Sequence, residues 1–410
     1  MKVWVKLLIG SMLGLLLGFL LPYDNPRVLE AFSYLAKLAI SAGRYTAAPL
    51  IIFSLTIAIY ELRQDSGFWR LVFRTLLLIA VSSVIVIVLG IIVTMFFPPE
   101  RIPILIEQQA EQITLGTRLY FLEMFPSNMM SVISSDGKYL FPFCVFAFFM
   151  AIGLSYDKNY TKPVLAIVDS LSRVFYHIAA FFSEILGLLM IALSAYWAIQ
   201  YHTIINAGIF MAIVRLLLIF SVILAFIILP LFLFLIKKNK NPWKIIYATL
   251  GSAIAAFFSG DINFTLPVLI QQSKENLGIR RRANSVAVML WTVFGRAGSA
   301  MVAVISFIVI IKSYSSLGIP YENYISIGLQ ALLISFFLAR NPGDGAFAAL
   351  AVLCSGYGRG FETGFLILKP VAFYLISIGA FLDVIIASLG TFAIARLSGF
   401  QTEKETKNFI

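Results

Sequence analysis

Two apolar segments in the C-terminal half of the chain are interrupted by short polar tips that carry glycine and proline. The first tip, residues 258–267, reads FSGDINFTLP, and the second, residues 339–346, reads ARNPGDGA. A turn inside a bilayer leaves backbone groups without partners, so it is tolerated only where protein or water surrounds it. Paired interruptions of this kind indicate the midplane binding site of a transporter. We therefore expect two re-entrant helical hairpins whose tips face each other and enclose a small polar solute.

The composition of the whole chain indicates a polytopic α-helical membrane protein. Of its 410 residues, 60% are hydrophobic and 12% are charged, and the mean hydropathy is +0.94. Soluble domains of this length do not have such a composition, and several apolar runs reach about 20 residues, enough to span the hydrocarbon core. The net charge of +11 comes from lysines and arginines in short loops and at helix ends. This distribution predicts membrane topology, and no nucleic-acid partner is expected.

The residues that usually carry catalysis or bind metals are few and scattered. Cys144 and Cys354 both lie in apolar runs, and His177 and His202 are far apart in the chain. We expect neither a disulfide nor a metal site, and no catalytic constellation or cofactor. Lys2 and Lys6 precede an apolar run without a small-residue cleavage site, which favours a retained first helix over a signal peptide.

The apolar runs predict an all-α fold with eight transmembrane helices and two hairpins. The helices are expected at about residues 3–21, 29–62, 71–97, 120–154 (broken near Asp136), 164–198, 204–236, 283–312 and 365–397, and the hairpins at about 242–277 and 321–357. The arms of the first hairpin have only about 10 to 15 residues, too few to span a bilayer at 1.5 Å per residue.

Five basic clusters predict the orientation of these helices. They are Lys2 and Lys6; Arg63 and Arg70; Lys237, Lys238, Lys240 and Lys244; Arg280 to Arg282; and Lys404 and Lys407. Eight spans put all five clusters on one side, which the positive-inside rule assigns to the cytoplasm. We therefore expect a protein of the cell membrane with both termini cytoplasmic. The first hairpin then enters from the cytoplasm and the second from outside, as in an inverted repeat.

Several motifs resemble the glutamate transporter homologues, the dicarboxylate/amino acid:cation symporter family. They are DINFTLP at 261–267, NLGI at 276–279, NPGDG at 341–345, FPSN at 125–128 and LGII at 89–92. The resemblance covers nearly the whole chain and implies a homotrimer with an elevator mechanism. Residues 1–70 and 98–199 would form the fixed scaffold, residues 71–97 and 204–399 the mobile transport domain, and residues 400–410 a cytoplasmic tail.

The chain departs from this family where the resemblance would locate sodium and substrate. Where the family has Asn-Met-Asp-Gly-Thr, residues 295–299 read GRAGS. Gly295, Ala297 and Ile394 thus replace side chains that the resemblance assigns to sodium, a cation that needs several oxygen ligands. Gly390 replaces the asparagine that would hold the substrate α-carboxylate, and Ile386 replaces the arginine that would read an acidic side chain. The family's sodium sites are therefore expected to be absent or weakened, and the solute to be a neutral or apolar amino acid or another small molecule.

Arg296 and Asp383 carry the central hypothesis for the site. An arginine cannot deprotonate, so Arg296 would keep a tethered cation in the polar pocket. Asp383 falls at the position that the resemblance assigns to the substrate amino group, and it is the only acid in mid-helix 8. Charges in mid-membrane are expensive and need partners. We expect Arg296 to pair with Asp383, either as part of a solute site or as a structural lock between two helices.

The two tips offer further solute-binding candidates. Asp261 and Asp344 lie one on each tip, with Arg340 beside the second. They are candidates for a gate latch, for solute contacts or for proton carriage, or they are solvated charges in an aqueous vestibule. Neutral hydrogen bonds are expected from Ser259, Asn263, Ser299 and Asn341, and close backbone approach from Gly343. Arg44 and Glu184, inside helices 2 and 5, are interpreted as scaffold charges or lipid-interface residues.

These observations favour a secondary transporter of a small amino-acid-like or carboxylate solute that does not depend on sodium. Three alternatives remain open: a non-transporting sensor or binding protein locked by Arg296 and Asp383, a symporter that couples to sodium or protons through other ligands, and an anion channel. The expected partners are the solute, the lipid bilayer and two further copies of the chain. An enzyme is the least favoured class.

Overall fold

The computed structural model describes residues 2–22, 25–97, 101–102, 125–126, 128–205, 208–237, 241–314, 319–358 and 360–409. Within these ranges the chain is helical, and its β pairing is limited to one isolated bridge between Ile279 and Gln401. Eight of the described helical stretches are long and apolar enough to cross a membrane. The predicted all-α polytopic class is confirmed. The start of the predicted fourth helix, residues 120–124, lies outside the described ranges.

The N-terminal half contains six described α-helices and one short 3-10 helix. Their bounds are α1 (Val3–Leu20), α2 (Pro26–Arg44), α3 (Ala47–Gln64), α4 (Phe68–Phe96), η1 (Met129–Val132), α6 (Phe141–Tyr156) and α7 (Lys158–Ile205). The helix predicted over 29–62 is in fact two, α2 and α3, which meet at Tyr45 and Thr46. Pro49 contributes to this break, because it has no N–H for a helical bond and is tolerated in the first turn of α3.

The C-terminal half contains both hairpins and two interrupted helices. Its elements are α8 (Met211–Ile223), the π-helical η2 (Leu224–Ile228), α9 (Leu229–Lys237), α10 (Trp243–Ala248), α11 (Leu250–Ser259), α12 (Ile262–Glu275), α13 (Arg281–Phe294), α14 (Ala297–Tyr314), α15 (Tyr321–Phe337), η3 (Leu338–Arg340), α16 (Gly345–Tyr357), η4 (Gly364–Val371), α17 (Ala372–Leu397) and η5 (Thr406–Asn408).

Helix–turn–helix units, α11–α12 and α15–α16, lie where the sequence predicts the two hairpins, and their re-entry into the membrane remains a prediction. The arms α11 and α12 have 10 and 14 residues, or about 15 and 21 Å of helix, less than the about 30 Å of a hydrocarbon core. The stretch Tyr321–Arg340, which contains α15 and η3, has 20 residues and could cross a membrane by length and composition. The first arm of the second hairpin is thus longer than the half-depth segment expected from the sequence.

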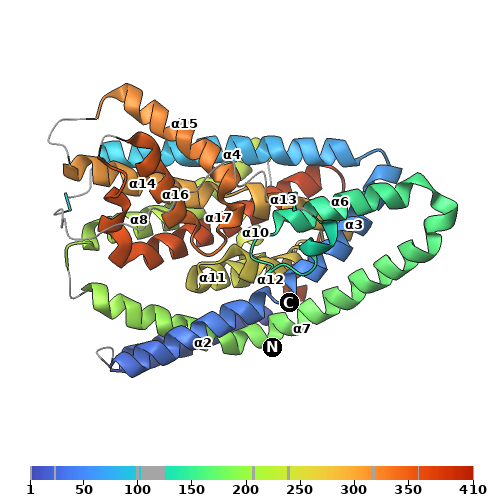
Figure 1. The fold of residues 1–410 in the computed structure, drawn as a ribbon, viewed down its shortest axis with the longest axis horizontal. Helices are drawn as coiled ribbons and strands as arrows, with labels where there is room; N and C mark the ends of the chain where they lie inside the picture. The colour runs from blue at the N-terminus through green and yellow to red at the C-terminus, as the bar shows by residue number, and fades with distance from the viewer. Residues whose placement is uncertain are drawn as a thin grey trace.

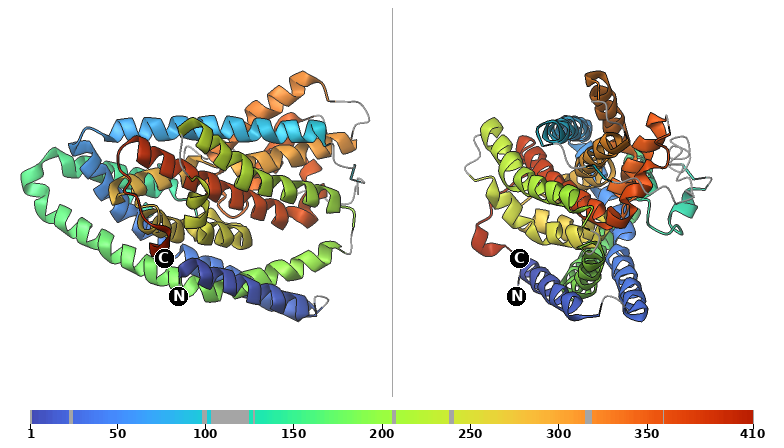
Figure 2. Two further views of the ribbon diagram at one scale, coloured as in Figure 1. Left: turned by 180° about the vertical axis from the view of Figure 1, so that it is seen from behind. Right: turned by 90° about the vertical axis from the view of Figure 1, so that its left-hand side faces the viewer.

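The first hairpin and the second arm of the second hairpin lie in the interior of a helical assembly, whereas α15 lies at its periphery beyond α4 (Figure 1). In the side views α4 runs along one long edge and α7 along the opposite edge, with α11, α12, α14, α16 and α17 between them (Figures 1 and 2). In its most apolar window, the stretch Arg281–Tyr314 is 94% buried, against 33% for α1 and for α4. Residues of α13 and α14 therefore form the core, whereas α1 and α4 leave most of their apolar surface to the bilayer.

Described members of four of the five basic clusters assigned to one side of the membrane are adjacent in space. Lys2 donates to the carbonyl of Lys407 at 3.4 Å, and the N–H of Arg280 donates to the carbonyl of Phe400 at 2.9 Å. Lys244 donates to the carbonyl of Lys404. This proximity agrees with the predicted common side, while the assignment of that side to the cytoplasm remains a prediction. The two chain ends accordingly lie near each other in Figure 1.

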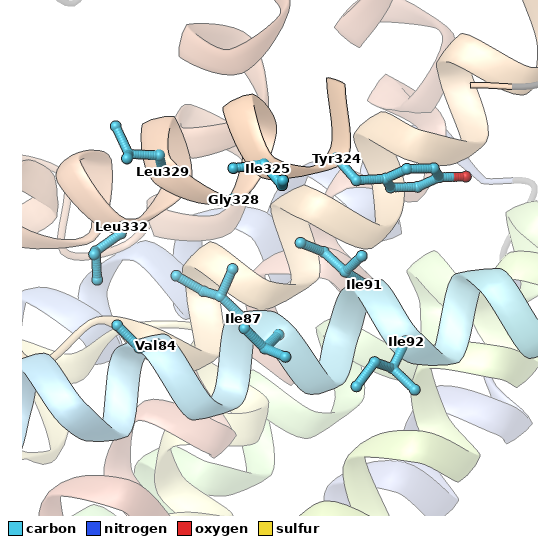
Figure 3. A pocket seen from close by; sticks show the side chains of 10 residues that line it. Val84, Ile87, Ile91, Ile92, Tyr324, Ile325, Gly328, Leu329 and Leu332 are labelled. Carbon is cyan, nitrogen blue, oxygen red and sulfur yellow. The ribbon is translucent and has the colours of Figure 1, made fainter. Parts of the chain in front are cut away.

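A groove of about 370 Å³ separates α4 from α15. In Figure 3 Val84 of α4 lies opposite Leu332 of α15 across this groove, and Ile87 and Ile91 face the part of α15 around Gly328. Many of the lining side chains are exposed, Ile325 by 72%. Such an apolar surface suits contact with lipid chains rather than with water.

Candidate functional site

The first hairpin tip is built around Asp261. Gly260 ends α11 with a φ of +64°, a conformation that glycine adopts without strain. Asp261 then caps α12, because its Oδ1 accepts hydrogen bonds from the N–H groups of Asn263 at 2.8 Å and Phe264 at 3.3 Å. Its other oxygen, Oδ2, forms an ion pair with Nη2 of Arg44 at the end of α2. The Asp261 side chain is fully buried and that of Arg44 is 20% exposed.

Arg296 lies in the interruption between α13 and α14, where Gly295 ends the first helix. Its Nε is 3.2 Å from Oδ2 of Asp383, and the side chain is 1% exposed. The ion pair predicted from the sequence is therefore present in the structure, although Nε does not point at the oxygen as in a hydrogen bond. Nη2 donates to the carbonyls of Pro342 at 3.2 Å and Asn341 at 3.4 Å, so Arg296 also contacts the second tip.

Asp383 is held at the beginning of α14 mainly by Ser299. Its Oδ1 accepts from the N–H of Ser299 at 3.0 Å, and its Oδ2 accepts from the Ser299 hydroxyl at 2.6 Å. The first N–H groups of a helix have no partner within the helix and attract anions. The carboxylate thus interacts with the guanidinium of Arg296, with both donors of Ser299 and with the backbone N–H of Gly298.

The second tip lies between the two guanidinium groups. A Cβ built on Gly343 would lie 3.2 Å from Nη2 of Arg44 and 3.5 Å from Oδ2 of Asp261. A Cβ built on Gly345 would contact Nη2 of Arg296 and lie 3.1 Å from the Ser299 hydroxyl. A side chain at position 345 would displace the end of Arg296, whereas a Cβ at position 343 would make only a tight contact with Arg44. The structure therefore joins both tips and the interrupted helix around two buried ion pairs.

Other polar candidates of the tips are already engaged within the protein. Asn263 donates to the carbonyl of Lys138 at 2.8 Å, and the hydroxyl of Ser259 donates to the carbonyl of Ala255 at 2.7 Å. Asn341 takes part through its backbone carbonyl. Asp344 is exposed and lies within electrostatic reach of Asp261 and Arg44. A solute bound by Asn263 or Ser299 would have to share these groups with their present partners.

Sequence reasoning missed Trp291. This tryptophan is fully buried in α13, and a Cβ built on Gly295 or on Gly390 would collide with its indole ring. Gly390, predicted to contact the solute, therefore lies against the Trp291 ring, and Ile386 is 3% exposed on the same helix. Trp291 precedes Gly295 by one helical turn, a spacing that brings two residues onto one face of a helix. This spacing was the sequence signal that could have indicated the contact.

Of the two interpretations of Arg44, that of a lipid-interface residue is wrong, because its guanidinium is paired with Asp261 at the first tip, and that of a scaffold charge stays a prediction. An arginine inside an apolar helix requires a partner, but the sequence does not reveal which one. Glu184, interpreted in the same way, pairs with Lys6 of α1 at 2.8 Å.

The comparison with known families identifies the chain's relationship. A family model described as the sodium:dicarboxylate symporter family matches residues 3–397. The chain belongs to this family. As a sodium:dicarboxylate symporter family member, it is 21% identical over 360 residues to the proton/sodium-glutamate symport protein of Bacillus subtilis, a match that covers 85% of this chain and 82% of the relative.

Two further members of the sodium:dicarboxylate symporter family show how the similarity is distributed. The serine/threonine transporter SstT of Enterococcus faecalis is 22% identical over 399 residues, 94% of this chain and 87% of the relative. The human excitatory amino acid transporter 1 is 28% identical over 131 residues, 32% of this chain and 24% of the relative. The bacterial matches extend over most of both chains, so the family relationship is not confined to the hairpins.

Proposed function

We propose that this protein is a secondary transporter of a small amino-acid-like or carboxylate solute. The bacterial relatives, named as a glutamate symport protein and a serine/threonine transporter, support this class of solute. The observation that carries the proposal is Nη1 of Arg296, a buried donor without a hydrogen-bond partner among the described residues. Buried donors are nearly always paired, and a carboxylate is the acceptor that a guanidinium binds best.

In this proposal Arg296 binds a carboxylate of the solute while Asp383 faces its amino group. Asp261, Asn263, Asn341, Gly343 and Asp344 contribute from the tips, Ile386 lines the part that receives the solute's side chain, and Gly390 makes room for the Trp291 ring behind it. Ile386 has no charge to pair with an acidic side chain, so a solute with a neutral or apolar side chain is favoured.

The proposed coupling does not depend on sodium, in contrast to the family's name and to that of the Bacillus subtilis relative. Gly295, Ala297 and Ile394 offer no side-chain oxygen, and sodium needs several oxygen ligands. Arg296 would supply a fixed positive charge in its place. A solute amino group that approaches Asp383 would then compete with the Arg296 guanidinium for this carboxylate, whereas no sodium ion would bind beside it.

The proposed movement is an elevator within each protomer of a homotrimer. Residues 71–97 and 204–399 would move as one body against residues 1–70 and 98–199. Two features support this assignment: both hairpin tips and the interruption at Arg296 belong to the proposed mobile part, and irregular backbone at membrane depth is typical of the part of a transporter that holds solute.

The test is binding and uptake by the purified full chain. Thermal shift with neutral amino acids, acidic amino acids and dicarboxylates identifies a ligand, and proteoliposomes loaded with it report counterflow in sodium or in choline. We expect saturable counterflow of equal rate in both salts. Arg296→Met should abolish it, while Arg215→Met, which removes an exposed arginine of α8, should not. Counterflow in sodium alone would refute the sodium-independent coupling.

A non-transporting sensor is the second candidate, favoured by one observation. Arg296 connects three elements, since it pairs with Asp383 of α17, precedes α14 and donates to the carbonyls of the second tip. Such a connection would also hold the site shut. Binding without counterflow in the wild type and in Arg296→Met would support the sensor, and counterflow gained by that variant would support a removable lock.

A further inference from the structure

Arg44 belongs to a different part of the chain from every other group in the tip cluster. It is the last residue of α2, which the family resemblance assigns to the fixed scaffold, whereas Asp261 and Gly343 belong to the two hairpins. A cation in the last turn of a helix is favourable by itself, because it complements the helix dipole. That ordinary role does not require a buried carboxylate. Arg44 nevertheless pairs with the fully buried carboxylate of Asp261.

The contact extends beyond one ion pair. Gly43, next to Arg44, lies so close to the ring of Phe264 that a Cβ on it would collide with the ring. Asn263 donates to the carbonyl of Lys138, which precedes α6. Three residues near the start of α12, namely Asp261, Asn263 and Phe264, thus contact α2 or Lys138. The fit is specific, since one contact is ionic, one is a hydrogen bond and one is steric.

The same guanidinium reaches the second hairpin. The Arg44–Asp261 pair lies next to Gly343, because a Cβ built on this glycine would be 3.2 Å from Nη2 of Arg44. Asp344 is within electrostatic reach of both charges. Arg44 is therefore the described residue of α2 that contacts the first tip by charge and the second tip by proximity. If the tips separate, or if the first hairpin moves away from α2, Asp261 loses its partner inside the protein.

We propose that Arg44 is a positioning residue that fastens the closed tips of both hairpins to α2, and that its pair with Asp261 must open before the hairpins can move. The role of Arg44 in movement rests on the proposed transport function, whereas its contact with the hairpin tips is independent of that function. Removing one partner of a buried ion pair leaves an uncompensated charge, which is far more costly than removing both. Breaking the Arg44–Asp261 pair therefore adds to the free-energy barrier for hairpin movement.

A set of matched variants tests the pair. Arg44→Met leaves the Asp261 carboxylate alone, whereas Asp261→Asn keeps a good helix cap and removes only the charge. The double variant Arg44→Met/Asp261→Asn removes both charges, Arg44→Lys keeps a cation, and Arg27→Met changes an exposed arginine on the same helix. All are prepared as full chains, and folding is checked by size-exclusion chromatography and thermal unfolding.

The first readout does not require a known solute. Hydrogen–deuterium exchange is measured over residues 258–267 and 339–346, because exchange reports local opening. We expect Arg44→Met to raise exchange in both tips by about tenfold or more, the double variant and Arg44→Lys to raise it less, and Arg27→Met to leave it unchanged. A rise confined to one tip, or spread evenly over the whole chain, would overturn the proposal.

The second readout is counterflow with the ligand identified above. Arg44→Met should raise the maximal rate by about tenfold while the half-saturation concentration stays within about twofold, because Arg44 acts on movement and is not among the proposed solute contacts. An unchanged maximal rate would overturn the role in movement. If the wild type transports nothing, the proposed function fails, and the exchange experiment still decides whether Arg44 fastens the tips.

Discussion

The indole ring of Trp291 lies directly against Gly390, and no larger residue fits at position 390 without moving the ring. We therefore expect Gly390→Ala to lower the free energy of unfolding by about 1–3 kcal/mol, as overpacking of a well-packed core does. Thermal unfolding in detergent measures the effect. Gly153→Ala is the control, because a Cβ there meets nothing within 4 Å. Gly390→Ala combined with Trp291→Phe should recover part of the loss, and a loss as large as in the single variant would contradict this packing.

Arg296 and Asp383 should behave as one unit in stability. Asp383→Asn leaves a guanidinium that is 1% exposed without its counter-charge, and breaking a buried pair in this way costs about 3–5 kcal/mol. The double variant Arg296→Met/Asp383→Leu should cost less than Asp383→Asn alone, because no unpaired charge remains. Chemical or thermal unfolding of Asp383→Asn, Arg296→Met and the double variant completes the comparison. Additive losses would show that the two charges do not stabilise each other.

Arg281 links α13 to two other helices at the end of the molecule that carries the basic clusters. Its Nη2 is 3.1 Å from Oε1 of Glu61 on α3 and 2.7 Å from Oδ1 of Asp169 on α7. These side chains are 29% to 38% exposed, so each pair should contribute up to about 1 kcal/mol. Arg281→Gln should lower the melting temperature in low salt and have a smaller effect in 1 M salt, where screening is strong.

Arg173→Gln provides the control for that experiment. Arg173 also pairs with Asp169, four residues away on the same helix, but its side chain is 67% exposed. Its removal should change the melting temperature little at either salt concentration. If both substitutions lower the melting temperature equally, the contacts of Arg281 with two other helices contribute no more stability than an exposed arginine does.

Phe409 anchors the end of the chain to the base of the first hairpin. It is 3% exposed, stacks on Tyr247 at a centroid distance of 6.0 Å and lies 5.7 Å from the Lys244 ammonium. Phe409→Ala should cost about 3 kcal/mol, the lower end of the range for a buried phenylalanine. Limited proteolysis of residues 400–409 should become faster, whereas Lys407→Ala, at an exposed position, should leave it unchanged.

The sequence was sufficient for the features that follow from a single physical rule. Glycine and proline inside apolar runs predicted the two hairpins, and a charged residue inside an apolar helix requires a partner. Asp383 was the only acid available in the middle of the last long helix, so its pairing with Arg296 could be predicted. The interruption at Gly295 and Arg296 was not predicted, because residues 283–312 were expected to form one continuous helix.

Features that depend on the packing of distant helices could not be read in this way. Arg44 and Asp261 lie far apart in the chain, and each had other oppositely charged residues as possible partners. The break at Tyr45 and Thr46 was missed because both flanking helices are apolar and continuous in composition. Trp291 was overlooked because a tryptophan in a buried helix is usual, and only the positions of Gly295 and Gly390 reveal which space it fills.

The length of α7 has a consequence for any reconstitution of this protein. Its 48 residues correspond to about 72 Å of helix axis, against about 30 Å for the hydrocarbon core of a bilayer. A helix cannot shorten, so it meets a membrane of given thickness by tilting or by extending into the headgroup layers. Rates measured in short-chain and long-chain phospholipids should therefore be compared before any variant is judged, because the choice of acyl chain changes how this helix is seated.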